Sequence, residues 1–384
     1  MSPRAELAAR ARRGRIIVKI GSGVLTDSRG GLDTKTVRRL AGDIAPLTSP
    51  RRWPFVVSSG AIAVGTTELG LSARPKTMSG LQAAAAVGQS KLVEAWSAAF
   101  RRFEITVAQI LLTHADVEDR RRFLNARSAL LELERRRALA VINENDTVST
   151  EEIAFGDNDQ LAAEVANLVD ADLLVLMSVA PGILDGKGAR IPIAKADDEA
   201  LDGLILPQKS KTGVGGMSSK LKSARAATRR GAMVAIIEGR RPGALPALLS
   251  GEDIGTLLLP ESGEGKQRSR AHWIAHSLRP KGVVVVDAGA AKALAQGKRS
   301  LLPKGIVDVR GQFEEGDPVE VVGPGDAVLG RGLVRYGRAA LDAIKGLPSS
   351  SIAEKLGASL GDEAIHRDDL VLLGKPGEAP GGTA

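Results

Sequence analysis

The first 240 residues alternate short, nearly continuous apolar runs with longer stretches that repeat apolar side chains at helical spacing. The apolar runs predict strands at 15–20, 54–58, 104–112, 139–143, 171–178 and 232–239. The stretches between them predict helices at 34–47, 79–102, 119–136, 158–170 and 218–231. Strands that are apolar on both faces indicate a parallel sheet covered on each side. The pattern therefore predicts a three-layer α/β/α fold with a mainly parallel central sheet.

The pattern changes near residue 240 and again near residue 278. A stretch with Pro and Gly leads into the polar run ESGEGKQRSR at 261–270. From residue 279 the chain shows short strands separated by glycine-containing turns, which is typical of a small β-barrel or sandwich. We therefore expect an N-terminal arm at 1–14, an α/β domain at 15–260, a linker at 261–278, a β-rich domain at 279–375 and a disordered tail at 376–384.

Composition narrows the class of protein. The 384 residues include no cysteine and four histidines, which excludes disulfides and thiolate metal sites and disfavours a histidine metal cluster. Aromatic residues make up only 3%, so a base-stacking platform for nucleic acid is not expected. No apolar run is long enough to span a bilayer, and the N-terminus lacks the apolar middle of a signal peptide. We expect a soluble, cytoplasmic protein with no membrane partner.

The formal net charge is +8, and the first 15 residues hold five arginines and one glutamate. We interpret this N-terminal excess as a basic, frayed and solvated arm. Basic surfaces that bind nucleic acids cluster on a folded face instead.

Ligands of open α/β sheets bind beyond the carboxyl ends of the strands. The predicted strands deliver the following residues there: Lys19, Gly21 and Ser22; Ser59, Gly60 and Ala61; Asn143; and Ser178. A second lysine, Lys220, follows the glycine-rich run KTGVGGMSS near a helix start. A lysine within the apolar strand 15–20 must either be exposed at the strand end or have its burial compensated. Two lysines beside glycine-rich loops favour phosphoryl transfer, which needs cations on the transferred group.

The glycine-rich loops are candidates for phosphate binding, because glycine lets backbone N–H groups approach phosphate oxygens. Neither GSG after the first strand nor GVGGMSSK matches the P-loop or the dinucleotide-binding pattern. A serine nucleophile at Ser59 is disfavoured, because SSGAI is not a nucleophile-elbow sequence. The nearest histidine, His114, fits a helix cap or an exposed site better than a catalytic base.

An acidic stretch, VINENDTVSTEEIAFGDND at 141–159, stands out in a basic chain. The residues alone leave open a metal cage, a site for a cationic or metal-bridged substrate, and a solvated loop. The spacing from Asp157 does not fit a calcium-binding loop, but Mg²⁺ held jointly by carboxylates and nucleotide phosphates remains open. A substrate ammonium group also suits the stretch. Asp157, Asn158 and Asp159 have a further role open to them as caps of the helix at 158–170, and Glu151 and Glu152 have no assigned role.

Six blocks, in this order, resemble the glutamate 5-kinase family: VKIGSGVLT, VVSSGAIAVG, LQAAAAVGQSKL, VINENDTV, FGDNDQLAA and GGMSSKL. The runs LLPKGIVDVRGQFEEGDPVEV and LGRGLVRY resemble the PUA module found at the end of many members. The resemblance implies an amino acid kinase fold followed by a PUA-like barrel. It also implies ATP-dependent phosphorylation of the γ-carboxylate of L-glutamate, which begins proline synthesis. ATP with Mg²⁺ bound through its phosphates, inhibition by proline, a dimer or tetramer, and a partner glutamate-5-phosphate reductase are further expectations.

The same resemblance implies roles for individual residues. Lys19 and Lys220 would neutralise charge on the transferred phosphoryl group, and Asp159 would organise the two lysines. The glutamate site would comprise Ser59, Gly60, Ala61, Asn143, Asp146, Asp157 and Asn158. The nucleotide site would comprise Lys19, Gly21, Ser22, Ser178, Val179, Gly213, Val214, Gly215, Gly216, Met217, Ser218, Ser219 and Lys220.

Two positions depart from the family pattern, and both lie on the nucleotide side. Ser178 and Val179 stand where the family usually has a Thr-Asp pair, so an acidic contact is lost. Val214 stands where the family has a threonine, so a hydroxyl is lost. Glutamate recognition is expected to be intact, whereas nucleotide affinity or preference is the property that these changes affect.

Two other functions stay open. One is a kinase for aspartate or N-acetylglutamate, although the Asn- and Asp-rich stretch favours a free α-amino acid. The other is an RNA-binding protein that uses the PUA-like module. The near-neutral charge after residue 279 and the single tyrosine, Tyr336, weigh against RNA binding.

Overall fold

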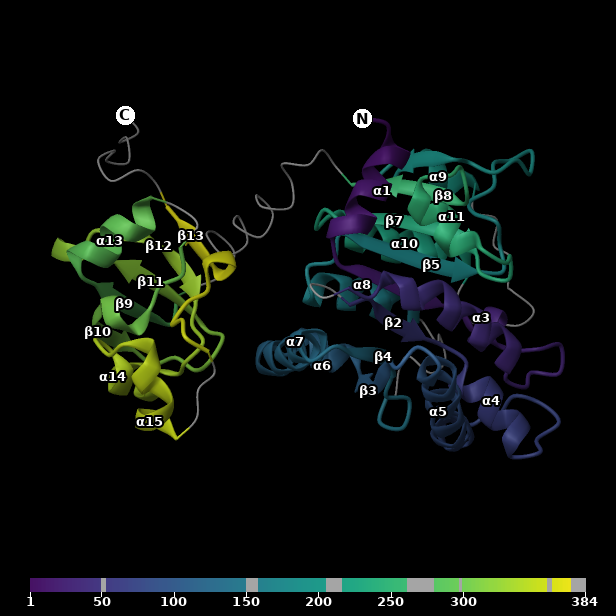
Figure 1. Cartoon of the computed structure of the whole chain (residues 1–384), viewed down its shortest axis with the longest axis horizontal. Helices are drawn as coiled ribbons and strands as arrows, with labels where there is room; N and C mark the ends of the chain where they lie inside the picture. Colours follow the sequence, from purple (N-terminus) through teal and green to yellow (C-terminus); the bar gives the residue numbers. More distant parts are fainter. Residues whose placement is uncertain are drawn as a thin grey trace. The chain divides into compact units, whose positions relative to one another are not determined.

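A large sheet with strand order β3-β4-β2-β1-β5-β7-β8-β6 organises the first part of the chain (Figure 1). Its strands are β1 (Ile16–Ile20), β2 (Phe55–Ser58), β3 (Thr106–Leu112), β4 (Ala138–Glu144), β5 (Leu173–Ser178), β6 (Ile193–Lys195), β7 (Met233–Glu238) and β8 (Thr256–Leu259). All neighbouring strands are parallel except β7 and β8. The predicted mainly parallel sheet is therefore confirmed, and β6 and β8 are strands that the apolar pattern did not predict.

The computed structural model describes residues 1–49, 53–149, 158–204, 216–260, 280–296, 299–357 and 361–373. The chain divides into two compact units, Met1–Lys266 and Gln267–Ala384. The expected linker at 261–278 and the expected tail at 376–384 lie outside the described residues. No helix in the described part of the chain is long and apolar enough to cross a membrane.

Helices cover both faces of the large sheet. In chain order they are α1 (Pro3–Arg13), α2 (Ser22–Leu25), α3 (Thr34–Ile44), α4 (Ala61–Glu68), α5 (Met78–Arg101), α6 (His114–Glu118), α7 (Arg120–Arg135), α8 (Asn158–Leu168), α9 (Ala200–Leu204), α10 (Met217–Thr228) and α11 (Ala244–Ser250), with a 3-10 turn at Ala45–Leu47. One apolar core joins the sheet to α1, α3, α5 and α11, and a second core joins it to α7, α8 and α10. This is the three-layer α/β/α arrangement expected from strands that are apolar on both sides.

Along β1, alternate side chains point to opposite faces of the sheet and therefore pack in different cores. Ile16, Val18 and Ile20 pack in the core with α3 and α5, whereas Ile17 packs in the core with α8 and α10. Successive side chains of a strand point to opposite faces. Lys19 therefore shares the face of Ile17, toward α8 and α10.

Helix α1 shows that the prediction of a frayed, solvated arm at 1–14 was wrong. Leu7 and Ala11, four residues apart, are buried in the core that includes α11. Arg4 donates to carbonyl groups in the loop before β8, and Arg10 donates to the carbonyl oxygen of Gly231 at 2.7 Å. A short apolar stripe among arginines thus suffices to dock the helix, and the arginines bind backbone carbonyl groups as well as solvent.

The second unit contains a five-stranded sheet in the order β10-β9-β11-β12-β13. Its strands are β9 (Gly282–Val286), β10 (Ile306–Gly311), β11 (Pro318–Val322), β12 (Val328–Leu333) and β13 (Leu370–Leu372), and its helices are α13 (Ala288–Ala295), α14 (Arg338–Ile344) and α15 (Ile352–Leu356). Short 3-10 turns occur at Pro303–Gly305, Pro324–Asp326, Ser349–Ser351 and Arg367–Asp369. Alternate strand residues such as Val319 and Val321 bury one face around Tyr336. The small β-rich domain expected after residue 279 is present.

Candidate active site

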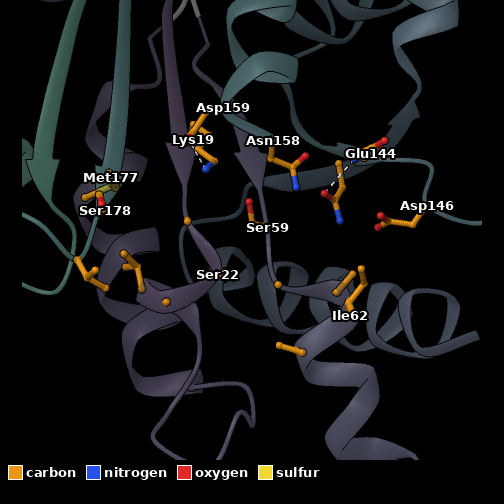
Figure 2. Close-up of a pocket in the computed structure, with 18 of the residues that line it drawn as sticks. Lys19, Ser22, Ser59, Ile62, Glu144, Asp146, Asn158, Asp159, Met177 and Ser178 are labelled. Atoms are coloured by element: carbon orange, nitrogen blue, oxygen red, sulfur yellow. Dashed lines mark hydrogen bonds and ion pairs between the residues drawn. The ribbon is translucent and has the colours of Figure 1, made fainter. Parts of the chain in front are cut away.

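A pocket opens at the carboxyl ends of four neighbouring strands, β4, β2, β1 and β5 (Figure 2). Strand β1 is central, and the chain places β2 on one side of it and β5 on the other. Such a reversal of strand order leaves a crevice between the loops that follow the strands, which is where open α/β sheets bind ligands. The sheet topology thus explains why the pocket lies here.

Two buried lysines meet one buried carboxylate at one end of this pocket. Lys19 from β1 donates to Asp159 Oδ1 at 2.5 Å, and Lys220 from α10 donates to Asp159 Oδ2 at 2.9 Å. The three residues Lys19, Lys220 and Asp159 are 5%, 7% and 1% exposed, respectively. The alternative of a lysine exposed at the strand end is therefore excluded for Lys19. Burial of both lysines is compensated by the shared ion pairs.

The electrostatics of Asp159 keep the cluster charged. Burial alone would raise the pKa of this carboxyl, but the charges of Lys19 and Lys220 and their hydrogen bonds outweigh burial and hold the pKa below its ordinary value. Asp159 lies in the first turn of α8, where the helix dipole also favours an anion. Two ammonium groups sharing one carboxylate leave a net positive charge, which can attract and orient phosphate oxygens.

The turn after β2 brings backbone N–H groups to the pocket. Ser59 is buried there, and Gly60 has a φ of 107°, a left-handed conformation that favours glycine. This turn starts α4 at Ala61, so the first N–H groups of the helix lack intrahelical partners. Ser59, Gly60 and Ala61 all line the pocket, where these donors suit a carboxylate or phosphate oxygen.

Helices α4 and α5 hold that turn in place, and they lie side by side (Figure 1). A Cβ atom on Gly88 of α5 would overlap the carbonyl oxygen of Ala61, and one on Gly65 of α4 would overlap the carbonyl oxygen of Ala84. The two glycines therefore permit a close backbone approach. The position of the pocket residue Ala61 depends directly on this contact.

The end of β4 carries a buried polar network. Asn143 Nδ2 donates to Gln89 Oε1 at 2.6 Å, and Asn143 Oδ1 accepts from the Glu144 N–H at 2.9 Å. Glu144 is buried and accepts from the Ser149 hydroxyl at 2.9 Å. Asn143 and Glu144 line the pocket, so the network fixes the side of the pocket that faces α5.

Asp146 follows this network and has a different electrostatic setting. Burial raises its pKa to about 6, and the charge of Arg74 opposes that rise. Arg74 lies in the loop between α4 and α5 and lines the pocket while keeping part of its surface exposed. Asn158, the first residue of α8, also lines the pocket, and its buried Oδ1 has no hydrogen-bond partner among the described residues. This part of the pocket thus presents acceptors for an ammonium group beside a guanidinium group.

The other side of the pocket is formed by the ends of β1 and β5. The Gly21 N–H donates to the carbonyl oxygen of Met177 at 3.0 Å, and Gly21 precedes the short helix α2, which begins at Ser22. Ser178 is buried, whereas Val179 is 48% exposed at the pocket. An apolar side chain therefore stands at the solvent-facing part of the predicted nucleotide side.

Most of the residues singled out from the sequence converge on this pocket. Those that line it are Lys19, Gly21, Ser22, Ser59, Gly60, Ala61, Asn143, Asp146, Asn158, Asp159, Ser178, Val179 and Lys220. Gly216, Met217, Ser218 and Ser219 lie at the start of α10 outside the lining, and Asp157, Gly213, Val214 and Gly215 lie outside the described residues. His114 is not in the lining and contacts Glu164 instead, 2.6 Å from its Oε1.

Gly23, part of the GSG run considered for phosphate binding, also lines the pocket. Six lining residues had no predicted role: Val24, Ile62, Ala63, Arg74, Glu144 and Met177. Glu144 belongs to the acidic stretch at 141–159, and the unusual number of carboxylates there was a sign that the stretch could contribute to a site. Arg74 lies in a loop without periodicity, and only the tertiary structure brings it to Asp146. In the described part of the chain, no three acidic or histidine side chains group as a metal site would require.

Comparison of the sequence with models of known protein families finds a match in each of the two units. The model of the Amino acid kinase family matches residues 14–238, and that of the PUA domain matches residues 282–356. A glutamate 5-kinase of Stutzerimonas stutzeri is 45% identical over 365 residues, which cover 94% of this chain and 98% of that protein. A glutamate 5-kinase of Syntrophotalea carbinolica is 42% identical over 364 residues, covering 93% and 97%.

The chain therefore belongs to the amino acid kinase family and, within it, to the glutamate 5-kinases. A solved isopentenyl phosphate kinase of T. acidophilum is 16% identical and aligns with a TM-score of 0.43, covering 64% of this chain and 99% of that one.

Proposed function

We propose that this chain transfers the γ-phosphoryl group of ATP to the γ-carboxylate of L-glutamate, which yields L-glutamyl 5-phosphate and ADP in the first step of proline biosynthesis. The observation that carries the proposal is the Lys19–Asp159–Lys220 cluster in a pocket that Asp146 also lines. Family membership supports the same activity.

The chemistry requires positioning and charge compensation more than proton transfer. A carboxylate oxygen of glutamate forms a bond to the γ-phosphorus while the bond from that phosphorus to the β–γ bridging oxygen breaks. The glutamate side chain is already ionised near neutral pH, because its ordinary pKa is about 4.3, so no general base is needed. Lys19 and Lys220 would hold the phosphate oxygens and stabilise the charge that moves to ADP.

The residues around the pocket divide between two substrates in this proposal. Ser59, Gly60, Ala61, Asn143, Asp146 and Asn158 would bind glutamate, together with Asp157. Gly21, Ser22, Ser178, Val179 and the start of α10 would bind ATP, together with residues 213–215. Val179 would leave the nucleotide without an acidic contact at its position, so we propose an altered nucleotide affinity or preference.

Mg²⁺ would accompany ATP and assist by neutralising phosphate charge. Both oxygens of Asp159 accept hydrogen bonds from lysines, so this carboxylate is not available as a simple metal ligand. The donor set of the described pocket thus fits an ion held mainly by the nucleotide phosphates and water, as is usual for Mg²⁺. Inhibition by proline, a dimer or tetramer, a partner reductase, a role for the PUA-like unit in RNA binding and a cytoplasmic location stay predictions.

The proposed activity is tested with the full-length chain in a coupled assay for ADP release. L-Glutamate, L-aspartate and N-acetyl-L-glutamate are compared at fixed ATP, and hydroxylamine traps any acyl phosphate as a hydroxamate. We expect ADP release and hydroxamate formation that depend on L-glutamate. Product from aspartate or N-acetylglutamate but not from glutamate would assign the chain to another amino acid substrate. Salt-sensitive tRNA binding without any glutamate-dependent ADP release would contradict a kinase function.

A further inference from the structure

The described residues that line the pocket place its charges in two groups. Lys19 and Lys220 both pair with Asp159. Arg74 is a third cation, and its charge acts on Asp146. A further carboxylate, Glu144, also lines the pocket and accepts a hydrogen bond from the Ser149 hydroxyl. In Figure 2, Lys19 and Asp159 lie on one side of Asn158 and Ser59, and Asp146 lies on the other. The pocket is therefore cationic at one end and carries both signs of charge at the other.

The charges of a glutamate molecule complement these two groups of pocket residues. Its γ-carboxylate must face Lys19 and Lys220 to receive the phosphoryl group, so its α-carbon must face Asp146. The α-carbon carries an ammonium group and a second carboxylate. Asp146 suits the ammonium group, but it would repel the α-carboxylate unless a cation stood beside it. Arg74 meets that requirement at the matching end of the pocket.

The chemistry and setting of Arg74 suit a carboxylate ligand. A guanidinium group presents a planar fork of donors that matches the two oxygens of a carboxylate. Pro75 follows directly, which restricts the Arg74 backbone to extended conformations. Arg74 lines the pocket as an exposed residue, and partial burial lowers its pKa while the charge of Asp146 opposes this.

We propose that Arg74 binds the α-carboxylate of the amino acid substrate and, with Asp146, selects a substrate whose ammonium and α-carboxylate groups are both free. The proposal rests on the proposed function, because it fixes the direction of glutamate from the position of phosphoryl transfer. Arg74 is then a specificity-determining residue rather than part of the phosphoryl-transfer machinery.

The test compares L-glutamate with L-isoglutamine, which keeps the γ-carboxylate and the ammonium group but has a neutral amide in place of the α-carboxylate. The wild-type full-length chain, Arg74→Gln and Arg74→Lys are assayed by hydroxamate formation with saturating ATP. The control is Lys76→Gln, which removes an exposed cation from the same loop, two residues away and outside the pocket lining. Thermal unfolding of each variant without substrate establishes that it is folded.

We expect Arg74→Gln to lower kcat/KM for glutamate by roughly 10- to 100-fold, the usual effect of losing a hydrogen bond to a charged group. Its kcat/KM for isoglutamine should change less than about threefold, so the preference for glutamate collapses. Arg74→Lys should restore part of the preference, and Lys76→Gln should match the wild type. The KM for ATP should be the same in all four proteins.

Two results would overturn the proposal while leaving the kinase function intact. A parallel loss for both substrates would show that Arg74 supports the pocket without reading the α-carboxylate. An unchanged preference in Arg74→Gln would show that another group, such as the N-terminus of α4, binds the α-carboxylate. If the wild type forms no product from glutamate, the proposed function itself is wrong and the role of Arg74 falls with it.

Discussion

Replacing Asp146 with asparagine removes a carboxylate whose ionisation the folded protein disfavours. Burial raises the pKa of Asp146 from its ordinary 3.8 to about 6, even though the charge of Arg74 acts in the opposite direction. The residue is only 9% exposed, so solvent screens little of this effect. The shift is about two pKa units, which corresponds to about 3 kcal/mol at 1.36 kcal/mol per unit.

The sign of the effect follows from proton binding. Between about pH 4 and pH 6 the folded state keeps a proton on Asp146 that the unfolded state has lost, so the free energy of unfolding falls as pH rises. Below that window Asp146 is protonated in both states and the penalty is absent. Above it the full penalty of about 3 kcal/mol applies. The asparagine side chain that replaces it does not titrate, so Asp146→Asn avoids the penalty.

We therefore expect the free energy of unfolding of Asp146→Asn, relative to wild type, to increase by up to about 3 kcal/mol between pH 4 and pH 7.5. For a unit of this size the corresponding shift in melting temperature is about 6–12 °C. Tryptophan fluorescence, to which the buried Trp53 and Trp96 of the first unit contribute, can follow urea unfolding at each pH. Measuring the difference between the two proteins cancels the titration of all other groups.

Glutamate provides the second half of this experiment. If Asp146 pairs with the substrate ammonium group, glutamate should stabilise the wild type at pH 7.5 and should have little effect on Asp146→Asn. A difference in unfolding free energy that does not vary with pH would refute the assigned pKa. Equal stabilisation of both proteins by glutamate would refute the assigned contact.

The remaining predictions concern catalysis and packing. The KM for glutamate at saturating ATP should be constant above about pH 7 and rise about tenfold per unit below about pH 6, because only ionised Asp146 binds the ammonium group; a flat profile would contradict this, and Asp146→Asn should abolish the dependence. Lys220→Ala should lower kcat by about 100- to 1,000-fold or more, because it removes charge compensation from the transferred phosphoryl group. The exposed Lys222 on the same helix gives the matched control, Lys222→Ala, and similar rates for the two variants would argue against the role of Lys220. Gly88→Ala should destabilise the first unit by about 1–3 kcal/mol or more and raise the KM for glutamate, because its Cβ would push on Ala61. Gly203→Ala in α9, where a Cβ has nothing within 4 Å, should leave both the melting temperature and the KM close to wild type.

The strands of the large sheet were predictable because burial on both faces forces continuous apolar runs. Ile17 and Val18 belong to different cores, yet each must be apolar. Strands β6 and β8 were missed because they lie at one edge of the sheet and are short. Element type could be read from the sequence, whereas edge strands depend on neighbours that a local pattern does not contain.

The sequence did not predict the environment of a charged residue where its partner lies far along the chain. The arginines at the N-terminus suggested a solvated arm, but Arg10 finds a carbonyl group 221 residues away. Lys19 was ambiguous for the same reason, since its partner Asp159 lies 140 residues away. The sequence shows that such residues carry charge, but only the fold shows which charges meet.

The pocket's charge arrangement has a consequence for the substrates that compete with glutamate. N-acetylglutamate lacks the ammonium group, so its binding would leave the buried carboxylate of Asp146 without a cationic partner from the substrate. Aspartate has one methylene fewer, so it could not satisfy Asp146 and also present its side-chain carboxylate to Lys19 and Lys220 at the same distance. The first rejection rests on the Asp146 end of the pocket alone, whereas the second rests on the distance between its two ends. A substitution at Asp146 should therefore weaken discrimination against N-acetylglutamate, and it should also weaken discrimination against aspartate, because the anchor that holds the substrate ammonium group at a fixed distance from the lysines is lost.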